Sequence, residues 1–393
     1  MYIQLPSQIT DNVSVFWRLK KTLYGLPESP SAFYNDVSGF LLRYGYTRTA
    51  ADPCMFYKRR GSKLIMMVVH VDDFAVASTD QELIDDLLRT LRVRYALKVS
   101  ESLETFLGIH IEHLPDGTMC LTQPKQIDEL VKEYGLQKLK YANVPMSSKF
   151  SDEDQDDSPR CDYTRYMRLL GKLLFIIKTR PDIAYAVNRL ATTRAQWCTE
   201  KDFQALLRVV SYLGGTREMG ICFHRTAKAD AAAATRLFCF VDATYASHPD
   251  SRSQTGYCFS LGDFAGMFYS RSTKQTNVTL SSTESENSAA VEATKEIIWF
   301  RQLLAELGFE QLEPTLIFAD NASMITLAED FSGNHKRVKH YITRVNFLIE
   351  QVREGVIRFQ HVPSESNVAD ILTKPLGPVD FHRLRPLLLG MKE

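Results

Sequence analysis

Four acidic residues in the second half of the 393-residue sequence have the spacing and surroundings of metal ligands. Asp242 lies near the end of a predicted strand, Asp320 ends the apolar run TLIFAD, and Asp370 is expected to open the last helix. Glu286 lies between them on a long predicted helix. An acid that ends a buried strand is costly to leave unpaired. Any one of these aspartates could be a cap or turn residue, but together they favour a shared site.

Helical spacing favours Glu286 over the neighbouring Glu284 as the helix-borne ligand. The stripe that contains Glu286 continues through small and apolar residues, namely Ala290, Ala293, Ile297, Phe300 and Leu304. Such a stripe packs against a sheet. Glu284 falls on another face and can form a capping box with Ser281, although Thr283 could form a similar box with Glu286. We therefore expect Glu286 to face the sheet.

Carboxylates that converge in a buried site cannot all stay ionised without compensating positive charge. Two divalent cations would supply that charge, and a site made of carboxylate oxygens favours Mg²⁺ or Mn²⁺. Two ions held about 4 Å apart can stabilise both the attacking water and the leaving 3′ oxygen of a phosphodiester. The four acids therefore predict metal-assisted phosphodiester hydrolysis with two ions in the site.

The elements that must position these acids form an alternation of strands and helices after residue 235. The expected order is a strand, a hairpin turning at Gly262-Asp263, a long helix, a strand, a helix, a strand and a last helix. In sequence these are 236–243, 256–271, 282–307, 315–320, 337–355, 356–362 and a helix that begins at 367–374. This mixture of strands and helices is typical of an α/β or α+β domain.

The first half of the sequence mixes helices with strands, and helices follow it. We expect helices over 29–45 and 81–95, two strands with an acidic turn over 64–78, and a hairpin over 104–123 that turns at Pro115-Asp116-Gly117. Further helices are expected over 166–180 and 181–193. The acidic run 151–159 is the best linker candidate, and small residues at 229–234 mark a second break. The predicted parts are 1–145, 146–232 and 233–393.

The charge balance is mildly against a nucleic-acid enzyme, because 47 basic residues match 47 acidic ones. Local basic clusters, not the total charge, neutralise phosphates, so the balance does not exclude this function. Ordinary solvated faces are the alternative explanation for each cluster. The clusters are Arg18, Lys20 and Lys21; Lys58, Arg59, Arg60 and Lys63; and Lys336, Arg337 and Lys339.

The seven cysteines are odd in number and form no CxxC pair. This pattern favours reduced thiols in a cytoplasmic or nuclear protein over a disulfide framework or a zinc site. No signal peptide is visible at the N-terminus, and no apolar stretch approaches the roughly 20 residues needed to span a bilayer. We therefore expect a soluble protein without a membrane partner.

The motifs after residue 235 resemble, in order, the RNase H domain of copia-type LTR retrotransposons. They are FVDATYASHPDSRSQTGYCFSL, SRSTKQTNVTLSSTESEN, FADNASMITL, KHYITRVNFLIEQV and HVPSESNVADILTKPL. The resemblance implies an RNase H fold, with a five-stranded mixed sheet flanked by helices, and cleavage of the RNA in RNA–DNA hybrids. It assigns the family's acids to the four residues chosen above. Asn287 departs from the family, which usually has an aromatic residue there.

Two histidines of the same region could lie near the substrate. Lys339 and His340 match the family's KH motif and are possible nucleic-acid contacts, with an ordinary place on an amphipathic helix as the alternative. His361, in the motif HVPS, could lie near the acids, although a structural role at a strand end explains it better.

Asp72 and Asp73, in VHVDDFAVAS, lie at a predicted turn where aspartate is favoured for structural reasons alone. The motifs RLKKTLYGLPESPSAFY, ADPCMFY, VHVDDFAVAS and FLGIHI, however, resemble the reverse transcriptase of the same elements. The resemblance implies a polymerase palm and thumb in which these two aspartates bind Mg²⁺. It also implies residues that contact the template, primer and nucleotide: Gly25, Ser29, Pro30, Phe106 and Gly108.

The family also has an upstream palm aspartate, within a segment like DVKTAFLNG, and the sequence begins just after that segment. We therefore expect a truncated reverse transcriptase, without the fingers and the first catalytic aspartate, that does not polymerise alone. The predicted whole is the C-terminal part of a Pol polyprotein, whose parent element forms virus-like particles and whose partners are template–primer and RNA–DNA hybrids. One alternative is a catalytically dead remnant that at most binds nucleic acid. Another is a true start farther upstream.

Overall fold

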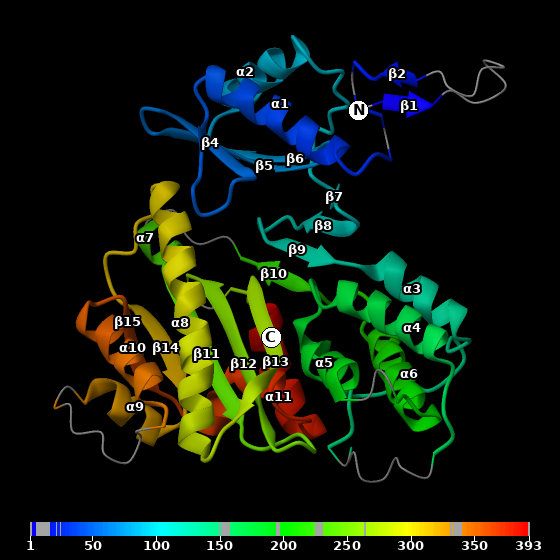
Figure 1. Cartoon of the computed structure of the whole chain (residues 1–393), viewed down its shortest axis with the longest axis vertical. Helices are drawn as coiled ribbons and strands as arrows, with labels where there is room; N and C mark the ends of the chain where they lie inside the picture. Colours follow the sequence, from blue (N-terminus) through cyan, green and yellow to red (C-terminus); the bar gives the residue numbers. More distant parts are fainter. Residues whose placement is uncertain are drawn as a thin grey trace. The chain divides into compact units, whose positions relative to one another are not determined.

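The computed structural model (Figure 1) describes residues 2–4, 16–20, 22–23, 25–148, 150, 158–193, 197–224, 231–262, 265–330, 332 and 340–391. The chain divides into two compact units, Met1–Ser102 and Leu103–Glu393, which we call the N-terminal and C-terminal units. Each unit is described by itself. None of the described helices is both long enough and apolar enough to cross a membrane.

The N-terminal unit contains a short hairpin, a four-stranded antiparallel sheet and two helices. The hairpin pairs β1 (Tyr2–Gln4) with β2 (Phe16–Arg18). The sheet, in the order β3-β4-β5-β6, consists of β3 (Thr47–Arg48), β4 (Met55–Arg60), β5 (Lys63–His70) and β6 (Asp73–Ser78). The helices are α1 (Ser29–Arg43) and α2 (Gln81–Arg92).

The amphipathic spacing of α1 and α2 explains why they cover one face of this sheet. Leu83, Leu87 and Leu91 repeat every four residues along α2, and all three are buried in one core with Phe56 and Met67 of the strands. The Asp80 side chain caps the first turn of α2 by accepting a hydrogen bond from the Glu82 backbone N–H. The predicted helices and the two strands joined by an acidic turn are confirmed in this unit.

The C-terminal unit begins with a second four-stranded sheet, in the order β10-β9-β8-β7. Its strands are β7 (Thr105–Phe106), β8 (Ile109–His113), β9 (Met119–Thr122) and β10 (Ile221–Phe223). The predicted hairpin at Pro115-Asp116-Gly117 joins β8 to β9 and is confirmed. Between β9 and β10 in the sequence, the described residues form four α-helices: α3 (Pro124–Glu133), α4 (Tyr163–Ile176), α5 (Ala184–Thr193) and α6 (Glu200–Gly215).

The prediction that every cysteine is a reduced thiol is wrong for two of the seven. Cys120 and Cys222 form a disulfide, and the other five cysteines are free. The two residues lie directly opposite each other in the antiparallel pair β9·β10, with 4.1 Å between their Cα atoms. A sequence separation of 102 residues hides this proximity, because only the pairing of the strands brings the two residues together.

The predicted five-stranded mixed sheet is confirmed in the rest of the C-terminal unit, in the order β13-β12-β11-β14-β15. Strand β11 pairs antiparallel with β12 and parallel with β14, and β14 pairs parallel with β15. This arrangement is the sheet of an RNase H-like fold. The strands are β11 (Leu237–Thr244), β12 (Arg252–Leu261), β13 (Tyr269–Val278), β14 (Thr315–Ala319) and β15 (Ile357–His361).

Helices flank this sheet, and one prediction about them is wrong. Asp370 does not open the last α-helix but lies within a short 3₁₀ helix, η5 (Val368–Leu372), whose first turn is capped by Asn367. Pro375 and Pro378 follow, and proline cannot continue a helix, so the last α-helix starts only at Pro378. The remaining helices are η2 (Pro181–Ile183), α7 (Ala231–Ala234), α8 (Ser282–Glu306), α9 (Ala322–Glu329), α10 (Ile342–Arg353), η4 (Ser364–Ser366) and α11 (Pro378–Leu389).

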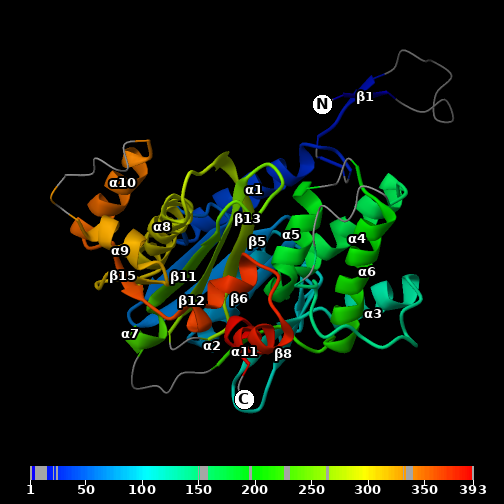
Figure 2. The same cartoon turned by 90° about the horizontal axis from the view of Figure 1, so that it is seen from below.

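Alternate residues of the central strand β11 enter two separate cores, one on each face of the sheet. Cys239 and Val241 pack with the α8 residues Ala290 and Ala293. Phe238 and Phe240 face the other way and share a core with residues of α11 and of the helices α3 to α6. This is the two-residue period of a strand that is buried on both faces. Figure 2 shows α8 and α11 on opposite sides of the sheet.

Candidate functional site

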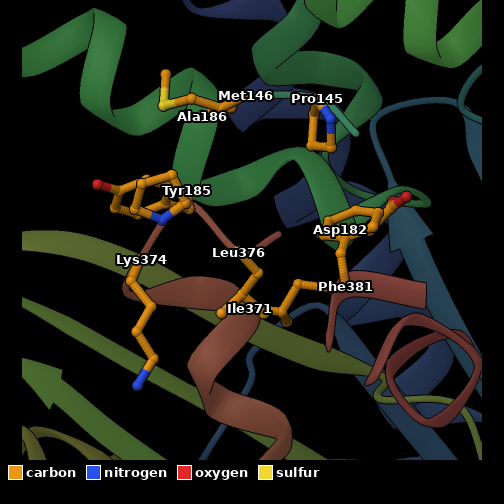
Figure 3. A pocket seen from close by; sticks show the side chains of 10 residues that line it. Pro145, Met146, Asp182, Tyr185, Ala186, Ile371, Lys374, Leu376 and Phe381 are labelled. Atoms are coloured by element: carbon orange, nitrogen blue, oxygen red, sulfur yellow. The ribbon is translucent and has the colours of Figure 1, made fainter. Parts of the chain in front are cut away.

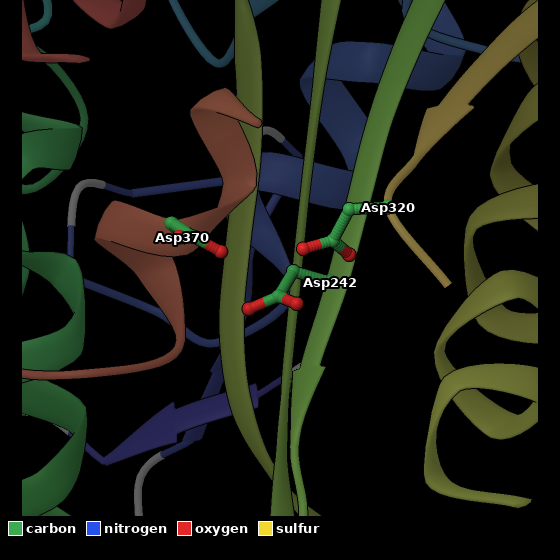
Figure 4. A group of neighbouring side chains, drawn as sticks. All are labelled: Asp242, Asp320 and Asp370. Carbon is green, nitrogen blue, oxygen red and sulfur yellow. The ribbon is translucent and has the colours of Figure 1, made fainter. Parts of the chain in front are cut away.

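The side chains of Asp242, Asp320 and Asp370 meet at one end of the five-stranded sheet (Figure 4). Each offers a carboxylate oxygen, and these three oxygens lie within 4.8 Å of one another. Asp242 belongs to β11, and Asp320 directly follows β14. These two strands are parallel neighbours, and Phe240 of β11 pairs with Phe318 of β14. The parallel pairing therefore brings two of the acids together from positions that are 78 residues apart in the sequence.

The third aspartate reaches the cluster because η5 packs directly on the backbone of β12 at a glycine. Gly256 lies opposite Asp242 in the β11·β12 ladder. A Cβ atom at this position would lie 2.5 Å from Thr373 Cγ2, 2.8 Å from Leu372 Cβ and 3.1 Å from the Ala369 carbonyl oxygen. Only glycine fits such a close approach without displacing the segment that carries Asp370. No pattern in the sequence singles out Gly256.

Glu286 is buried on the face of α8 that packs against the sheet, as the helical stripe predicts. It lies outside the group of three aspartate oxygens, but it is close enough to respond to their charges. Burial raises the pKa of Glu286 well above its usual value, and the charges of Asp242, Asp320 and Asp370 raise it further. Its Oε2 atom is buried and has no hydrogen-bond partner in the described part of the chain.

The other acid at the start of α8, Glu284, has a structural role, but only the Ser281 half of the predicted capping box forms. The Ser281 hydroxyl caps the helix by accepting a hydrogen bond from the Glu284 backbone N–H, at 3.2 Å. The Glu284 carboxylate accepts a hydrogen bond from the Leu280 backbone N–H, at 2.8 Å, and contacts His340 Nε2 at 3.0 Å. His340 therefore contacts this capping acid, whereas Lys339 lies outside the described residues.

Burial and mutual repulsion disfavour the charged forms of the clustered acids. The pKa of Asp370 is raised to about 7, first by burial and then by the charge of Asp242. Burial also raises the pKa of Asp242, although the nearby Lys374 and a hydrogen bond from Thr373 oppose this rise. Such a group of carboxylates requires positive charge if all of its members are to be ionised.

Three polar residues that the sequence analysis missed hold the aspartates in place. The Thr373 hydroxyl donates to Asp242, and the Ser364 hydroxyl donates to Asp320. Lys374 Nζ lies 2.8 Å from Asp370 Oδ1 and 3.9 Å from Asp242 Oδ2. The spacing of four residues between Asp370 and Lys374 is a signal of an ion pair that could have been found in the sequence.

Asn287, where the resemblance to the family implies an aromatic residue, is fully buried beside Glu286 on α8. Its amide nitrogen donates to the Thr283 carbonyl oxygen, at 2.9 Å, while its Oδ1 has no partner in the described part of the chain.

His361 is exposed at the end of β15. It pairs with Ala319, the residue that precedes Asp320.

Comparison with known proteins shows which proteins the chain resembles. Residues 1–148 match the family model described as reverse transcriptase (RNA-dependent DNA polymerase). The retrovirus-related Pol polyproteins from the Arabidopsis thaliana transposons RE1 and RE2 are 32% and 33% identical, over 94% and 93% of the chain. Over nearly its whole length the chain is similar to copia-type retrotransposon Pol polyproteins, and we refer to it as the Pol chain for this similarity. It spans only about a quarter of each relative, 25% of RE1 and 24% of RE2.

Among solved structures, the Pol chain is similar to the foamy viral protease–reverse transcriptase in complex with an RNA/DNA hybrid. The identity is 16%, over 87% of the chain and 39% of the viral protein, with a TM-score of 0.46. Residues 1–148 match the reverse transcriptase family model, and the five-stranded mixed sheet described above lies after them in the sequence.

The two aspartates predicted to belong to a polymerase site lie where the sequence predicts, on a two-residue turn between β5 and β6. His70 pairs with Asp73, so Val71 and Asp72 form the turn, and Asp72 and Asp73 are exposed. Val71 has a φ of 54°, a left-handed conformation that is strained for a β-branched residue. Backbone strain of this kind is frequent at functional sites.

The remaining predicted polymerase residues lie in two different units. Gly25, with a φ of 88°, precedes α1, and the Ser29 hydroxyl at the start of α1 donates to the Leu23 carbonyl oxygen at 2.6 Å. Pro30 occupies the first turn of the same helix. In the C-terminal unit, Phe106 pairs with Ile109, so Leu107 and Gly108 form a tight turn between β7 and β8. The Gly108 carbonyl oxygen accepts a hydrogen bond from Gln126 at 2.6 Å.

The basic cluster around β4 has a structural explanation. Lys58 and Arg60 both pair with Asp86 of α2, at 3.8 and 2.7 Å. Lys63 pairs with Asp80 at 2.7 Å. These pairs favour the alternative of an ordinary charged surface over a phosphate-binding patch. Of the other two clusters, Lys21, Lys336, Arg337 and Lys339 lie outside the described residues.

Proposed function

We propose that residues 233–393 form a metal-dependent endoribonuclease that cleaves the RNA strand of RNA–DNA hybrids. The observation that most supports this proposal is the convergence of Asp242, Asp320 and Asp370, whose oxygens lie within 4.8 Å of one another, with Glu286 buried beside them. Such a group of carboxylates at the end of a mixed sheet suits phosphodiester hydrolysis, because it can hold cations against both the attacking and the leaving oxygen.

The donor set fits a hard divalent cation. All four side chains offer carboxylate oxygens, which Mg²⁺ and Mn²⁺ prefer. Glu286 Oε2 is buried without a hydrogen-bond partner among the described residues, and a cation would compensate its desolvation. We propose that Asp242, Glu286, Asp320 and Asp370 hold two such ions. These would polarise the phosphodiester and lower the pKa of a bound water.

The protein's own contribution is to fix the positions of the acids. The hydroxyls of Thr373 and Ser364 donate to Asp242 and Asp320, which orients both carboxylates. The tight contact of η5 with Gly256 places Asp370 beside Asp242. Burial of Asp242 and Asp370 excludes water from their inner oxygens and so strengthens any interaction with a cation.

The choice of an RNA–DNA hybrid as substrate follows from the family relationship. A reverse transcriptase that copies RNA into DNA produces such a hybrid, so a nuclease on the same chain would meet it as the product of synthesis. Discrimination of the hybrid would require contacts to the 2′ hydroxyls of one strand. We propose template–primer duplexes and RNA–DNA hybrids as the nucleic-acid partners of this Pol chain.

The deciding experiment is cleavage of a labelled RNA–DNA hybrid by the purified chain with Mg²⁺, in comparison with Asp320→Asn. Loss of this carboxylate should reduce the rate by about two orders of magnitude or more. Glu292→Gln is the matched control, because Glu292 lies exposed on α8 and pairs only with Lys295 among the described residues. Equal cleavage by the wild type and Asp320→Asn would rule out this site as the source of activity.

The alternative function, a remnant that binds nucleic acid without cutting it, gives a different result in the same assay. Hybrid would then be bound but left intact by the wild type, with either metal. The buried and well-oriented carboxylates favour the enzyme over this alternative.

For residues 1–145 we propose that this part of the chain, taken alone, does not extend primers. Asp72 and Asp73 stand exposed on a two-residue turn, and an exposed carboxylate pair on a turn positions metal ions less firmly than a buried, hydrogen-bonded group. Primer extension with Mg²⁺ or Mn²⁺ tests this proposal, and templated extension would contradict it.

A further inference from the structure

A lysine ammonium lies inside the proposed metal site. Lys374 Nζ is 2.8 Å from Asp370 Oδ1 and 3.9 Å from Asp242 Oδ2, so it bridges two of the three clustered aspartates. No other lysine, arginine or histidine of the described residues lies within 4.0 Å of either carboxylate. Its side chain is 36% exposed, so one side of it remains open to solvent.

The rest of the Lys374 side chain is held by packing, not by charge. It lines a small cavity together with Met146, Tyr185, Leu376 and Phe381, which belong to different segments of the C-terminal unit. In Figure 3 the Lys374 nitrogen points away from these residues. The apolar stem therefore anchors the residue while the ammonium end stays free to change partners.

The charges around this ammonium explain why it lies there. Burial lowers the pKa of Lys374, but the charge of Asp242 and the ion pair with Asp370 outweigh that effect, and the pKa is raised overall. A single positive charge cannot neutralise three aspartates and Glu286, so the cluster keeps an excess of acidic groups. A divalent cation would compete with Lys374 for the same Asp370 and Asp242 oxygens.

We propose that Lys374 is a built-in counter-ion of the aspartate cluster, which holds Asp242 and Asp370 together before a divalent cation binds and gives way when the cation arrives. This inference rests on the proposed metal site. It makes Lys374 a positioning residue that opposes metal binding, so that the affinity of the site is lower than its carboxylates alone would give. The open side of Lys374 provides the path along which the ammonium can move out.

The direction in which the affinity for a divalent cation changes when Lys374 is replaced separates this role from a merely structural one. If Lys374 only supported the fold of η5, its removal would disorder Asp370 and weaken metal binding. If it is a competing counter-ion, its removal leaves the carboxylates with stronger repulsion, and a divalent cation binds more tightly. The metal-free protein then becomes less heat-stable while the metal-bound protein does not.

The test is a titration of the full chain with Mn²⁺ at low ionic strength, for the wild type and three variants. Lys374→Met keeps the apolar stem and removes the charge, and we expect it to bind Mn²⁺ about tenfold more tightly, since a unit charge within 4 Å is only partly screened by solvent. Lys374→Arg keeps the charge and should bind Mn²⁺ as the wild type does. Lys295→Met is the matched control, because Lys295 pairs with Glu292 on the exposed face of α8.

The outcomes distinguish the inference from the function on which it rests. If the wild type does not bind Mn²⁺ at all, the proposed metal site fails, and the inference fails with it. If the wild type binds Mn²⁺ but a folded Lys374→Met variant binds it equally or more weakly, the inference alone is overturned. Tighter binding by Lys374→Met, but not by Lys295→Met, supports it.

A second measurement on the wild-type chain covers the case in which Lys374→Met does not fold. Brief acetylation of the protein with and without Mn²⁺, followed by mass spectrometry, reports how accessible each lysine is. We expect Mn²⁺ to raise the acetylation rate of Lys374 severalfold relative to Lys295. An unchanged or lower relative rate would contradict the proposed displacement.

Discussion

The two acidic sites of this Pol chain are built in opposite ways. Asp72 and Asp73 are neighbours in the sequence and stand exposed on a turn between two adjacent strands. Asp242, Asp320 and Asp370 come from three separate elements and meet in a largely buried cluster. The first site needs only a hairpin to exist, whereas the second needs correct strand register and close packing of a 3₁₀ helix.

This difference determines where each site is vulnerable. A substitution far from the aspartates in sequence can disrupt the buried cluster, because its geometry depends on contacts such as that between Gly256 and Thr373. The exposed pair depends mainly on its own turn, where the strain is concentrated at Val71.

The largest effect is expected from Gly256→Ala, which adds one methyl group to β12. The new Cβ would lie 2.5 Å from Thr373 Cγ2 and 3.1 Å from the Ala369 carbonyl oxygen, so η5 must move and carry Asp370 away from Asp242. We expect the rate of hybrid cleavage to fall by about two orders of magnitude, because small misplacements of a catalytic group are that costly. Initial rates at saturating Mg²⁺ measure this effect.

The matched control is Gly171→Ala in α4, where an added Cβ meets no atom within 4 Å and alanine favours the helix. Its cleavage rate should equal that of the wild type. A Gly256→Ala variant as active as Gly171→Ala would show that the buried cluster tolerates displacement of η5. The contrast between the two acidic sites would then lose its basis.

A smaller effect is expected of pH on the affinity for Mn²⁺, because the pKa of Asp370 is raised. Burial and the charge of Asp242 raise the pKa of Asp370 from 3.8 to about 7, so a proton competes with a cation for this carboxylate below neutral pH. We expect the apparent Kd for Mn²⁺ to rise by up to about tenfold for each pH unit below 7 and to level off above it. Titrations between pH 5.5 and 8 measure the slope.

The raised pKa of Asp370 also affects the stability of the metal-free protein, and here low pH is favourable. Between pH 3.8 and about 7 the folded state holds a proton on Asp370 that the unfolded state has released. The stability that this group contributes is therefore present below pH 3.8 and is lost as the pH rises through about 7. Melting temperatures in chelator should show this decline in the wild type and less of it in Asp370→Asn. Identical pH profiles would contradict it.

Sequence patterns predicted the elements of both sites and the acids of the buried cluster, but not the packing contacts and the disulfide that join distant segments. The helical stripe selected Glu286, and the apolar runs placed Asp242 and Asp320 at strand ends, because these signals lie within one element. The close approach at Gly256 and the Cys120–Cys222 disulfide depend on partners that are more than 100 residues away. The element around Asp370 was assigned wrongly because prolines beyond it end the helix after a single turn. The Lys374 ion pair was missed although its spacing is local.

The smallest effect concerns the exposed site and comes from Val71→Gly. At φ 54° a β-branched residue pays a steric penalty that glycine avoids, although glycine also gains entropy in the unfolded chain. We expect a net gain of about 1 kcal/mol in the free energy of unfolding, measured by denaturant titration. Val93→Gly is the control, because Val93 is exposed at the end of α2 with an ordinary φ of −61°, and its replacement should destabilise the protein. A loss of stability in both variants would contradict the inference that the turn holding Asp72 and Asp73 is strained.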